Sequence, residues 1–236
     1  MWKKRLEEFR QEADNVKKDK RLPREFFTED GIRVAKKLLG KVLVHETKAG
    51  TIRGIITEVE SYMGIDDKGS HTYGGRRTER TEPMFHIGGT SYVYFTYGMY
   101  HCMNITSGQA ETPQAVLIRS VLPADEASKE RMLQLRMELQ AEKAKKHKAA
   151  KGENLDEAEI KRMQKNTLKH LADGPGKLCI AMGITKAQND VDMVSSPSFY
   201  VTEGITVAPA EIKAGKRIGI DYAEEAADYL WRFYIE

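Results

Sequence analysis

The chain has 236 residues, of which 40% are hydrophobic and 31% are charged. This composition supports one sizeable buried core and excludes a protein that is disordered throughout. Every apolar stretch is much shorter than the ~20 residues of a membrane helix, and the basic N-terminal stretch lacks the apolar segment of a secretory signal. Only two cysteines occur, outside any CxxC motif, which favours a reduced, cytoplasmic setting and excludes a zinc site built from cysteines alone.

Positive charge is concentrated in two blocks, although the net charge of the chain is only +3. Residues 1–50 and residues 129–170 each carry a net charge of +5, and a mildly acidic segment follows each block. A polyanion such as DNA could bind such blocks. Solvated helices with ion pairs four residues apart would have the same composition, so both interpretations stay open.

The first half of the chain shows helical patterns followed by strand-like patterns. Apolar residues at helical spacing predict a charged helix over 2–20 and a second helix over 28–39, with Thr28 as the N-cap of the second helix. The strand-like segments, which are rich in β-branched and aromatic residues, are 41–45, 51–61, 91–96 and 114–121.

The second half is predicted to contain two helices and several short strands. A helix is expected over 125–147, the Lys/Ala/Glu-rich segment 141–166 resembles an exposed helical or mobile insertion, and GPGKLCIAMGI at 174–184 predicts a buried helix. The expected strands lie near 198–208, 216–221 and 230–235. With no repeat and no linker, the sequence predicts a single mixed α+β domain, with an antiparallel β core and surrounding helices.

The motif TEVESY at 57–62 contains two candidate catalytic carboxylates. Strand alternation places Glu58 and Glu60 on the same side as Ile52, so these glutamates are expected to point inward near the end of the strand. Burial raises the pKa of a carboxylate, which makes an inward glutamate a candidate general base. The alternative is a solvent-facing strand edge with two ordinary glutamates.

The motif SHTYGGRRTER at 70–80 combines one histidine, two consecutive glycines and three arginines. Glycines let the backbone approach a ligand closely, and arginines bind phosphate through charge-assisted hydrogen bonds. A solvated glycine-rich turn with a structural histidine would have the same composition.

The motif SYVYFTYGMYHCMNI at 91–105 is unusually rich in tyrosine. Strand alternation places Tyr92 and Tyr94 on one face, whereas Phe95 and Tyr97 point the other way. Tyrosine rings are good platforms on which nucleobases stack. An ordinary aromatic core strand would show the same pattern, and the residues alone do not separate the two interpretations.

Arg119 lies inside the apolar run AVLIRSV, where a charge is costly unless it is paired. Its expected partner is Glu60 or Glu58. Such a pair around a water molecule would suit hydrolysis, whereas a structural ion pair is the alternative.

These motifs, taken together and in this order, resemble the alkyladenine (3-methyladenine) DNA glycosylase family. The resemblance runs from about Arg21 to the C-terminus and implies an alkyladenine DNA glycosylase-like domain over 21–236. The charged helical extension over 1–20, predicted from the residue pattern, and the segment 140–166 are not clearly covered by it. The segments that carry it are RLPREFF, VAKKLLGKVL, EVESY, SHTYGGRRTER, GGTSYVYFTYGMYHCMN, AVLIRSV, DGPGKLC and WRFY.

The resemblance also implies catalytic and base-binding roles. Glu60 matches the glutamate that deprotonates the attacking water, and Arg119 matches the arginine that helps to hold this water. Tyr62 and Tyr94 match the aromatic residues that sandwich the flipped base, and His71 matches the residue that contacts the edge of the base.

Further roles implied by the resemblance concern base selection and DNA contact. Asn104 matches the asparagine that disfavours guanine by crowding its 2-amino group, and Tyr97 matches the side chain that wedges into the duplex. The expected phosphate contacts are Arg76, Arg77, Arg80 and Lys177, the last together with the amides of DGPGKLC. For Lys177 the alternative is an ordinary surface lysine.

The implied protein is a monofunctional DNA glycosylase that flips a damaged, alkylated or deaminated purine out of duplex DNA and hydrolyses its N-glycosidic bond, leaving an abasic site in base-excision repair. No metal or other cofactor is expected, a monomer suffices, and the expected location is the cytoplasm, at the nucleoid. Two alternatives stay open: a non-catalytic nucleic-acid-binding protein with an aromatic platform, and a hydrolase of free nucleosides.

Overall fold

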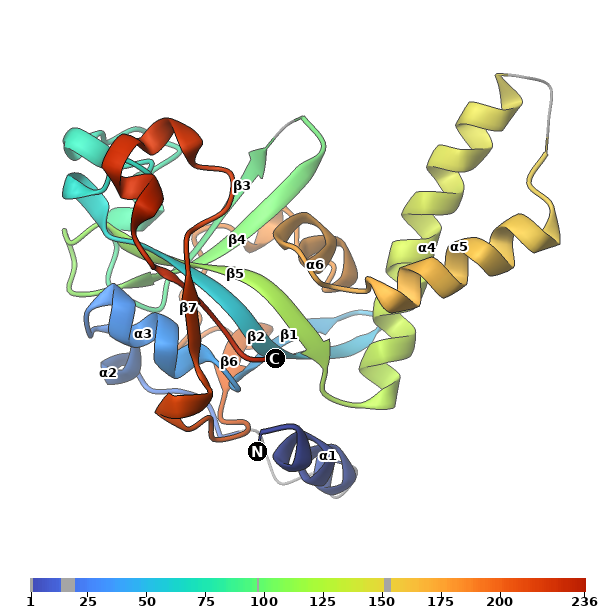
Figure 1. Cartoon of the computed structure of the whole chain (residues 1–236), viewed down its shortest axis with the longest axis horizontal. Coiled ribbons are helices and arrows are strands. Elements are labelled where there is room, and N and C mark those ends of the chain that lie inside the picture. Colours follow the sequence, from blue (N-terminus) through green and yellow to red (C-terminus); the bar gives the residue numbers. More distant parts are fainter. Residues whose placement is uncertain (1, 14–19, 97, 151–153) are drawn as a thin grey trace.

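The computed structural model describes residues 2–13, 20–96, 98–150 and 154–236. These residues form one mixed α+β domain, in which helices surround an antiparallel sheet, so the predicted fold class is confirmed (Figure 1). The strands are β1 (Val42–Thr47), β2 (Gly50–Tyr62), β3 (Ser91–Thr96), β4 (Tyr100–Ser107), β5 (Gln114–Pro123), β6 (Phe199–Thr202), β7 (Lys213–Gly215) and β8 (Arg232–Tyr234).

The strands follow the order β3-β4-β5-β2-β1-β6, and β8 pairs with both β2 and β7. The helices lie around this sheet, and within the described ranges none combines the length and the apolar character that a bilayer-spanning segment needs. The α-helices are α1 (Trp2–Ala13), α2 (Arg24–Phe27), α3 (Gly31–Leu38), α4 (Glu126–Ala149), α5 (Glu157–Lys169) and α6 (Pro175–Ala181). The 3-10 helices are Gly64–Asp66, Tyr73–Gly75, Glu82–Phe85, Lys186–Gln188, Pro209–Glu211 and Asp221–Asp228.

The long strand β2 lies at the centre of the core. Its residues Ile52, Ile55 and Val59 are fully buried, and Val59 faces Ile118 of β5 in the register. The register between β2 and β5 shifts on both sides of Glu58, which marks a bulge next to the site described below. Beyond this bulge β2 carries the buried polar residues Glu60 and Ser61 beside the core residue Val59.

Three local predictions need correction. The second helix begins at Gly31, because Asp30 caps it by accepting a hydrogen bond from the amide of Ile32, and Thr28 instead follows the short helix α2. The strand expected near 216–221 does not form: residues 216–220 lie in a loop between the three-residue strand β7 (Lys213–Gly215) and the 3-10 helix that begins at Asp221. Strand β4, which completes the tyrosine-rich hairpin, was not predicted.

The N-terminal helix α1 packs against the body of the domain. Leu6 belongs to the main hydrophobic core, and Arg10 donates to the carbonyl of Pro123. This helix ends at Ala13, and the rest of the helix predicted over 2–20 lies largely outside the described residues.

The basic segment near 141–166 forms the outer half of α4 and most of α5. The two helices project together from the body of the domain (Figure 1). The described part of this segment is therefore helical and largely exposed, as one of the two interpretations predicted.

Candidate active site

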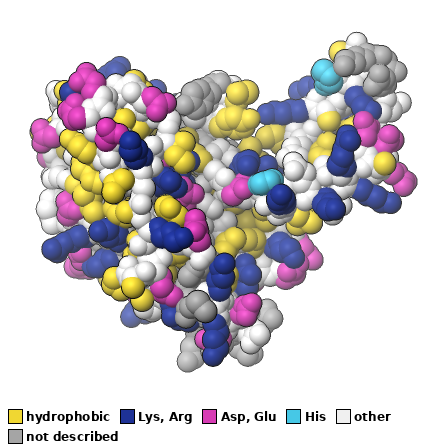
Figure 2. Space-filling model, in the orientation of Figure 1, with side chains coloured by type: hydrophobic (Ala, Val, Ile, Leu, Met, Phe, Trp, Pro, Cys, Tyr) yellow, Lys and Arg dark blue, Asp and Glu magenta, His cyan; other side chains and the backbone are white. Residues whose placement is uncertain are grey.

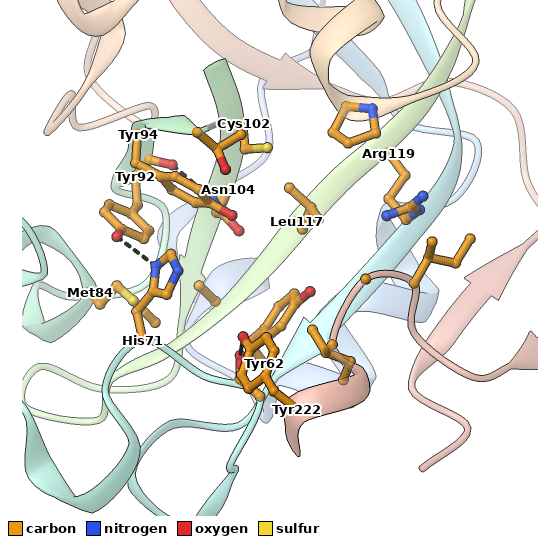
Figure 3. A pocket seen from close by; sticks show the side chains of 17 residues that line it. Tyr62, His71, Met84, Tyr92, Tyr94, Cys102, Asn104, Leu117, Arg119 and Tyr222 are labelled. Atoms are coloured by element: carbon orange, nitrogen blue, oxygen red, sulfur yellow. Dashed lines mark hydrogen bonds between the residues drawn. The ribbon is translucent and has the colours of Figure 1, made fainter. Parts of the chain in front are cut away.

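A cavity of about 290 Å³ opens where β3, β4, β5 and the end of β2 meet the loops that follow Tyr62 and Arg217. This volume lies at the small end of the range for ligand pockets, which suits a single planar ring system. The cavity is lined by several residues that the sequence singled out, and these are Tyr62, His71, Tyr94, Asn104 and Arg119 (Figure 3).

Glu60 lies behind the wall of this cavity, with no exposed surface. Its Oε1 accepts a hydrogen bond from the amide of Ile218 at 2.8 Å, and its Oε2 accepts one from the Tyr62 hydroxyl at 3.0 Å. Burial raises the pKa of Glu60, and the nearby charge of Arg119 opposes this rise. The carboxylate is thus poised to take up a proton at a higher pH than an exposed glutamate would.

Arg119 pairs with both glutamates of the TEVESY motif. Its Nη1 lies 3.3 Å from Oε1 of Glu60, and its Nε donates to Oε1 of Glu58 at 3.2 Å. Arg232 donates to the same Glu58 oxygen at 3.0 Å, so charges of opposite sign alternate along Arg232, Glu58, Arg119 and Glu60. The pairing expected from the sequence is confirmed for both partners, and the Arg119 side chain, 11% exposed, still reaches the cavity.

One wall of the cavity is a cluster of aromatic rings. The His71 ring lies edge-on to Tyr94, with centroids 4.7 Å apart, and its Nδ1 forms a hydrogen bond with the Tyr92 hydroxyl at 2.9 Å. Burial lowers the pKa of His71 to about 4, and the charges of Arg80 and Arg76 contribute to this decrease. His71 is therefore neutral at physiological pH.

Tyr62 lies across the cavity from Tyr94 (Figure 3). Tyr222, in the 3-10 helix Asp221–Asp228, lies close to Tyr62 on that side and also lines the cavity. No sequence pattern points to Tyr222, and strand alternation places Tyr92 only on the same face as Tyr94. The cavity therefore has aromatic rings on two sides, which is the arrangement that holds a flat ring between them.

Asn104 lines the cavity, and the neighbouring strand β3 fixes its position. It faces Tyr92 in the register of β3 and β4, and its Nδ2 donates to the Tyr92 carbonyl at 3.0 Å. This bond orients the buried amide, so its position relative to a ligand is set by the sheet.

The predicted phosphate-binding residues differ in their surroundings. Arg80 lies with its guanidinium 5.0 Å from the centroid of the Tyr94 ring, beside the cavity. Arg77 instead forms ion pairs with Glu82 and Glu111. Lys177 pairs with Asp173 at 2.9 Å.

Of the remaining two predicted DNA contacts, Arg76 is exposed on the same loop as Arg80, and Tyr97 lies outside the described residues. Among the residues that the structure describes, no three His, Cys, Asp or Glu side chains gather as metal ligands would.

A buried ion pair, which no motif of the sequence indicates, supports the wall of the cavity from behind. Arg217 donates to both carboxylate oxygens of Asp67, at 2.5 and 2.7 Å, and to the carbonyl of Ser61 at 3.0 Å. Its guanidinium also lies 4.8 Å from the centroid of the Tyr62 ring. The next residue, Ile218, supplies the amide that binds Glu60, so one arginine connects three segments of the site.

Comparison with known proteins assigns the chain to a family. The family model described as methylpurine-DNA glycosylase matches residues 25–236. A protein of Clostridium acetobutylicum is 45% identical over 92% of this chain and 94% of its own length, and one of Clostridium novyi is 46% identical over 92% and 96%. Both carry the name "Putative 3-methyladenine DNA glycosylase".

A third relative, from Desulfitobacterium hafniense, carries the same name and is 43% identical over 92% of this chain and 96% of its own length. The relatives thus match nearly the whole chain, and the match includes the segments that form the cavity. The chain therefore belongs to the methylpurine-DNA glycosylase family, and with it to the hydrolases that cleave N-glycosyl bonds in DNA.

Proposed function

We propose that this protein is a monofunctional glycosylase that flips a damaged purine, alkylated or deaminated, out of duplex DNA and releases it by hydrolysis. The observation that carries the proposal is a fully buried glutamate, Glu60, held by Arg119 at the wall of a small aromatic cavity. A protein that only binds nucleic acid has no use for a buried carboxylate at this place, since burying it costs free energy.

Base flipping is required because the anomeric carbon is shielded in a stacked duplex. In the proposed complex the base lies between Tyr62 on one side and Tyr94 with His71 on the other. Stacking offsets part of the cost of extrusion, and a cationic alkylated purine gains further from cation–π attraction. Neutral His71 adds no repulsion toward such a cation, and Asn104 faces the edge of the purine ring.

In the proposed reaction, Glu60 activates water and stabilises the positive charge that develops on the sugar. The water oxygen forms a bond to C1′, the bond between C1′ and the purine nitrogen breaks with its electron pair leaving on the base, and Glu60 takes a proton from the water. The Tyr62 hydroxyl donates to Oε2 of Glu60 and leaves this oxygen a second lone pair, which accepts the proton of the water. Arg119 keeps the carboxylate ionised and helps to hold the water.

The proposed DNA contacts surround the mouth of the cavity. Arg76 and Arg80 contact phosphates, whereas Arg77 and Lys177 contribute less because Glu82, Glu111 and Asp173 already neutralise their charges. Tyr97 fills the space that the flipped nucleotide leaves. A single chain carries all these groups, so we expect the active form to be a monomer, acting in the cytoplasm at the nucleoid.

The proposal is tested with lesion-bearing duplexes and with the matching free nucleosides. Duplexes that contain 3-methyladenine, 7-methylguanine, hypoxanthine or ethenoadenine are incubated with the protein, and both free base and strand breaks are measured. We expect free base and an abasic site without strand cleavage. Binding without base release would favour the nucleic-acid-binding alternative, and equal activity on free nucleosides would favour the nucleoside hydrolase.

A further inference from the structure

The outer half of α4 and the helix α5 form a projecting pair, called here the arm, which the base cavity does not use. The two helices are held to each other by Thr167, which donates to Gln140 at 2.8 Å, and by an ion pair between Lys148 and Glu159. The arm stands away from the body and leaves a notch between them (Figures 1 and 2). It is thus an ordered projection with a surface that the domain core does not cover.

The arm carries positive charge that its own carboxylates do not neutralise. Its lysines other than the half-buried Lys148 are exposed where the structure describes them, and Figure 2 shows Lys and Arg side chains along its length. Within the described ranges no carboxylate forms an ion pair with any of five arm lysines, which are Lys143, Lys145, Lys161, Lys165 and Lys169. An ion pair between Glu142 and Lys146, four residues apart, accounts for part of the charge on α4. Ion pairs of this kind do not account for the three lysines on α5 named above.

The spacing of the lysines on α5 points to an anionic partner. Lys161, Lys165 and Lys169 follow one another at intervals of four residues, so they form a row of like charges on one side of the helix. Such a row destabilises an isolated helix by a few tenths of a kcal/mol for each pair. A row of phosphates along the helix would turn this repulsion into attraction.

The base of the arm is connected to the base cavity. A groove of about 450 Å³ lies between α4 and α6 and is lined by Tyr100, Lys143, Pro175 and Lys177, among others. Pro175 also lines the base cavity, so the groove begins at the wall of that cavity. Lys143 lies with its ammonium group 5.4 Å from the centroid of the Tyr100 ring.

Close packing fixes the position of this groove. A Cβ atom on Gly176 would lie 2.9 Å from the Tyr100 ring, so only glycine lets α6 approach β4 so closely. Tyr100 in turn begins β4, the strand that carries Asn104 into the base cavity. The packing of α6 on β4 therefore fixes one side of the groove relative to the base cavity.

We propose that the arm binds the phosphate backbone of the duplex on one side of the damaged base, through Lys143 in the groove and through Lys165 and Lys169 on α5. This inference rests on the proposed glycosylase function and extends its contact surface. The 13 residues of α5 span about 20 Å. The two lysines that the proposal uses on α5 lie four residues and thus about 6 Å apart along it, which corresponds to about two base pairs.

The test compares two variants that lose the same charge. The arm variant is Lys143→Gln/Lys165→Gln/Lys169→Gln. The matched control is Lys4→Gln/Lys37→Gln/Lys213→Gln. These three lysines lie on α1, α3 and β7, away from the arm (Figure 1). All six side chains are exposed, so both variants are expected to fold, and circular dichroism checks this. Equilibrium binding to a lesion duplex is measured at several salt concentrations, together with base release at saturating protein.

We expect the arm variant to bind at least about fivefold more weakly, with a salt slope reduced by about 2–3, because each lost phosphate contact removes about 0.9 from the slope. The control variant should keep the wild-type slope. Base release at saturating protein should be unchanged in both, because the arm does not contact the reacting base. Equal affinity and equal slopes for the arm variant and the control would overturn the inference.

A second measurement uses the length of the duplex. With wild-type protein, shortening one flank to about three base pairs should weaken binding more than shortening the other flank, and the arm variant should lose this asymmetry. Symmetric behaviour of the wild-type protein would contradict the inference. A wild-type protein that binds lesion DNA but releases no base would instead contradict the glycosylase proposal, so the two failures are distinguishable.

Discussion

Arg217 and Asp67 form a bidentate ion pair with no exposed side-chain surface, directly behind the Tyr62 ring of the base cavity. Asp67 also accepts hydrogen bonds from the amides of Met63 and Gly69, so the pair organises the whole loop after β2. The loop that contains Gly69 and the segment that contains Ile218 both line the cavity. The shape of the cavity therefore depends on this pair.

Replacing Arg217 with alanine is expected to lower the free energy of unfolding by about 3–5 kcal/mol, because it leaves the carboxylate of Asp67 buried without its partner. The measurement is urea denaturation monitored by circular dichroism. The control is Lys213→Ala, which removes an exposed ion pair with Glu236 and should cost at most about 1 kcal/mol. A loss of less than about 1 kcal/mol in the Arg217 variant would show that the pair does not support the loop.

Protonation of His71 is expected to destabilise the protein in acid. Burial lowers the pKa of His71 to about 4, below the value near 6.5 of the unfolded chain. Between these pH values the unfolded state binds more protons, so the free energy of unfolding falls as the pH decreases from 6.5 to 4, by about 2–3 kcal/mol in all. Denaturation of the wild type and of His71→Asn across this range measures the effect, and identical pH dependence of the two proteins would contradict it.

The hydroxyl of Tyr62 is expected to tune the acid limb of the pH–rate profile. Its hydrogen bond to Oε2 helps to lower the pKa of Glu60, against the larger effect of burial. Tyr62→Phe keeps the stacking surface but removes this bond, so the pH below which single-turnover base release declines should move upward. Lesion-duplex affinity, measured on the same variant, should change little. A profile that stays in place would show that Tyr62 does not act on Glu60.

Tyr94→Leu is expected to weaken binding of a lesion duplex by about 1–3 kcal/mol, the range measured for the loss of one base–aromatic stacking contact. Tyr73→Leu is the matched control, since Tyr73 is exposed on the loop outside the cavity. Fluorescence anisotropy with lesion and undamaged duplexes measures the difference. Equal losses on both duplexes would indicate a general packing defect and would contradict a stacking role.

The sequence predicted the parts of the site that lie on one strand or in one motif. Glu60 and Arg119 could be paired from the sequence because a charge within an apolar run requires a partner. The relation between Arg217 and Asp67 could not be predicted, because the two residues are 150 positions apart and neither lies in a periodic pattern. Tyr222 was missed for a similar reason, since it stands in an irregular 3-10 helix that only the tertiary fold brings to the cavity.

The errors in the fold have local causes. Strand β7 has three residues, too few for the period-2 pattern that identifies a strand. The bulge at Glu58 shifts the register of β2 against β5, which simple alternation does not anticipate, yet both glutamates still reach Arg119.

The most direct test of the central claim is single-turnover base release by Glu60→Gln, with lesion-duplex affinity measured on the same preparation. Glu58→Gln is the charge-matched control, because Glu58 also pairs with Arg119 but sits outside the cavity wall. We expect Glu60→Gln to bind the lesion duplex as the wild type does and to release no detectable base, while Glu58→Gln still releases base. Base release by Glu60→Gln at a rate close to that of the wild type would contradict the account.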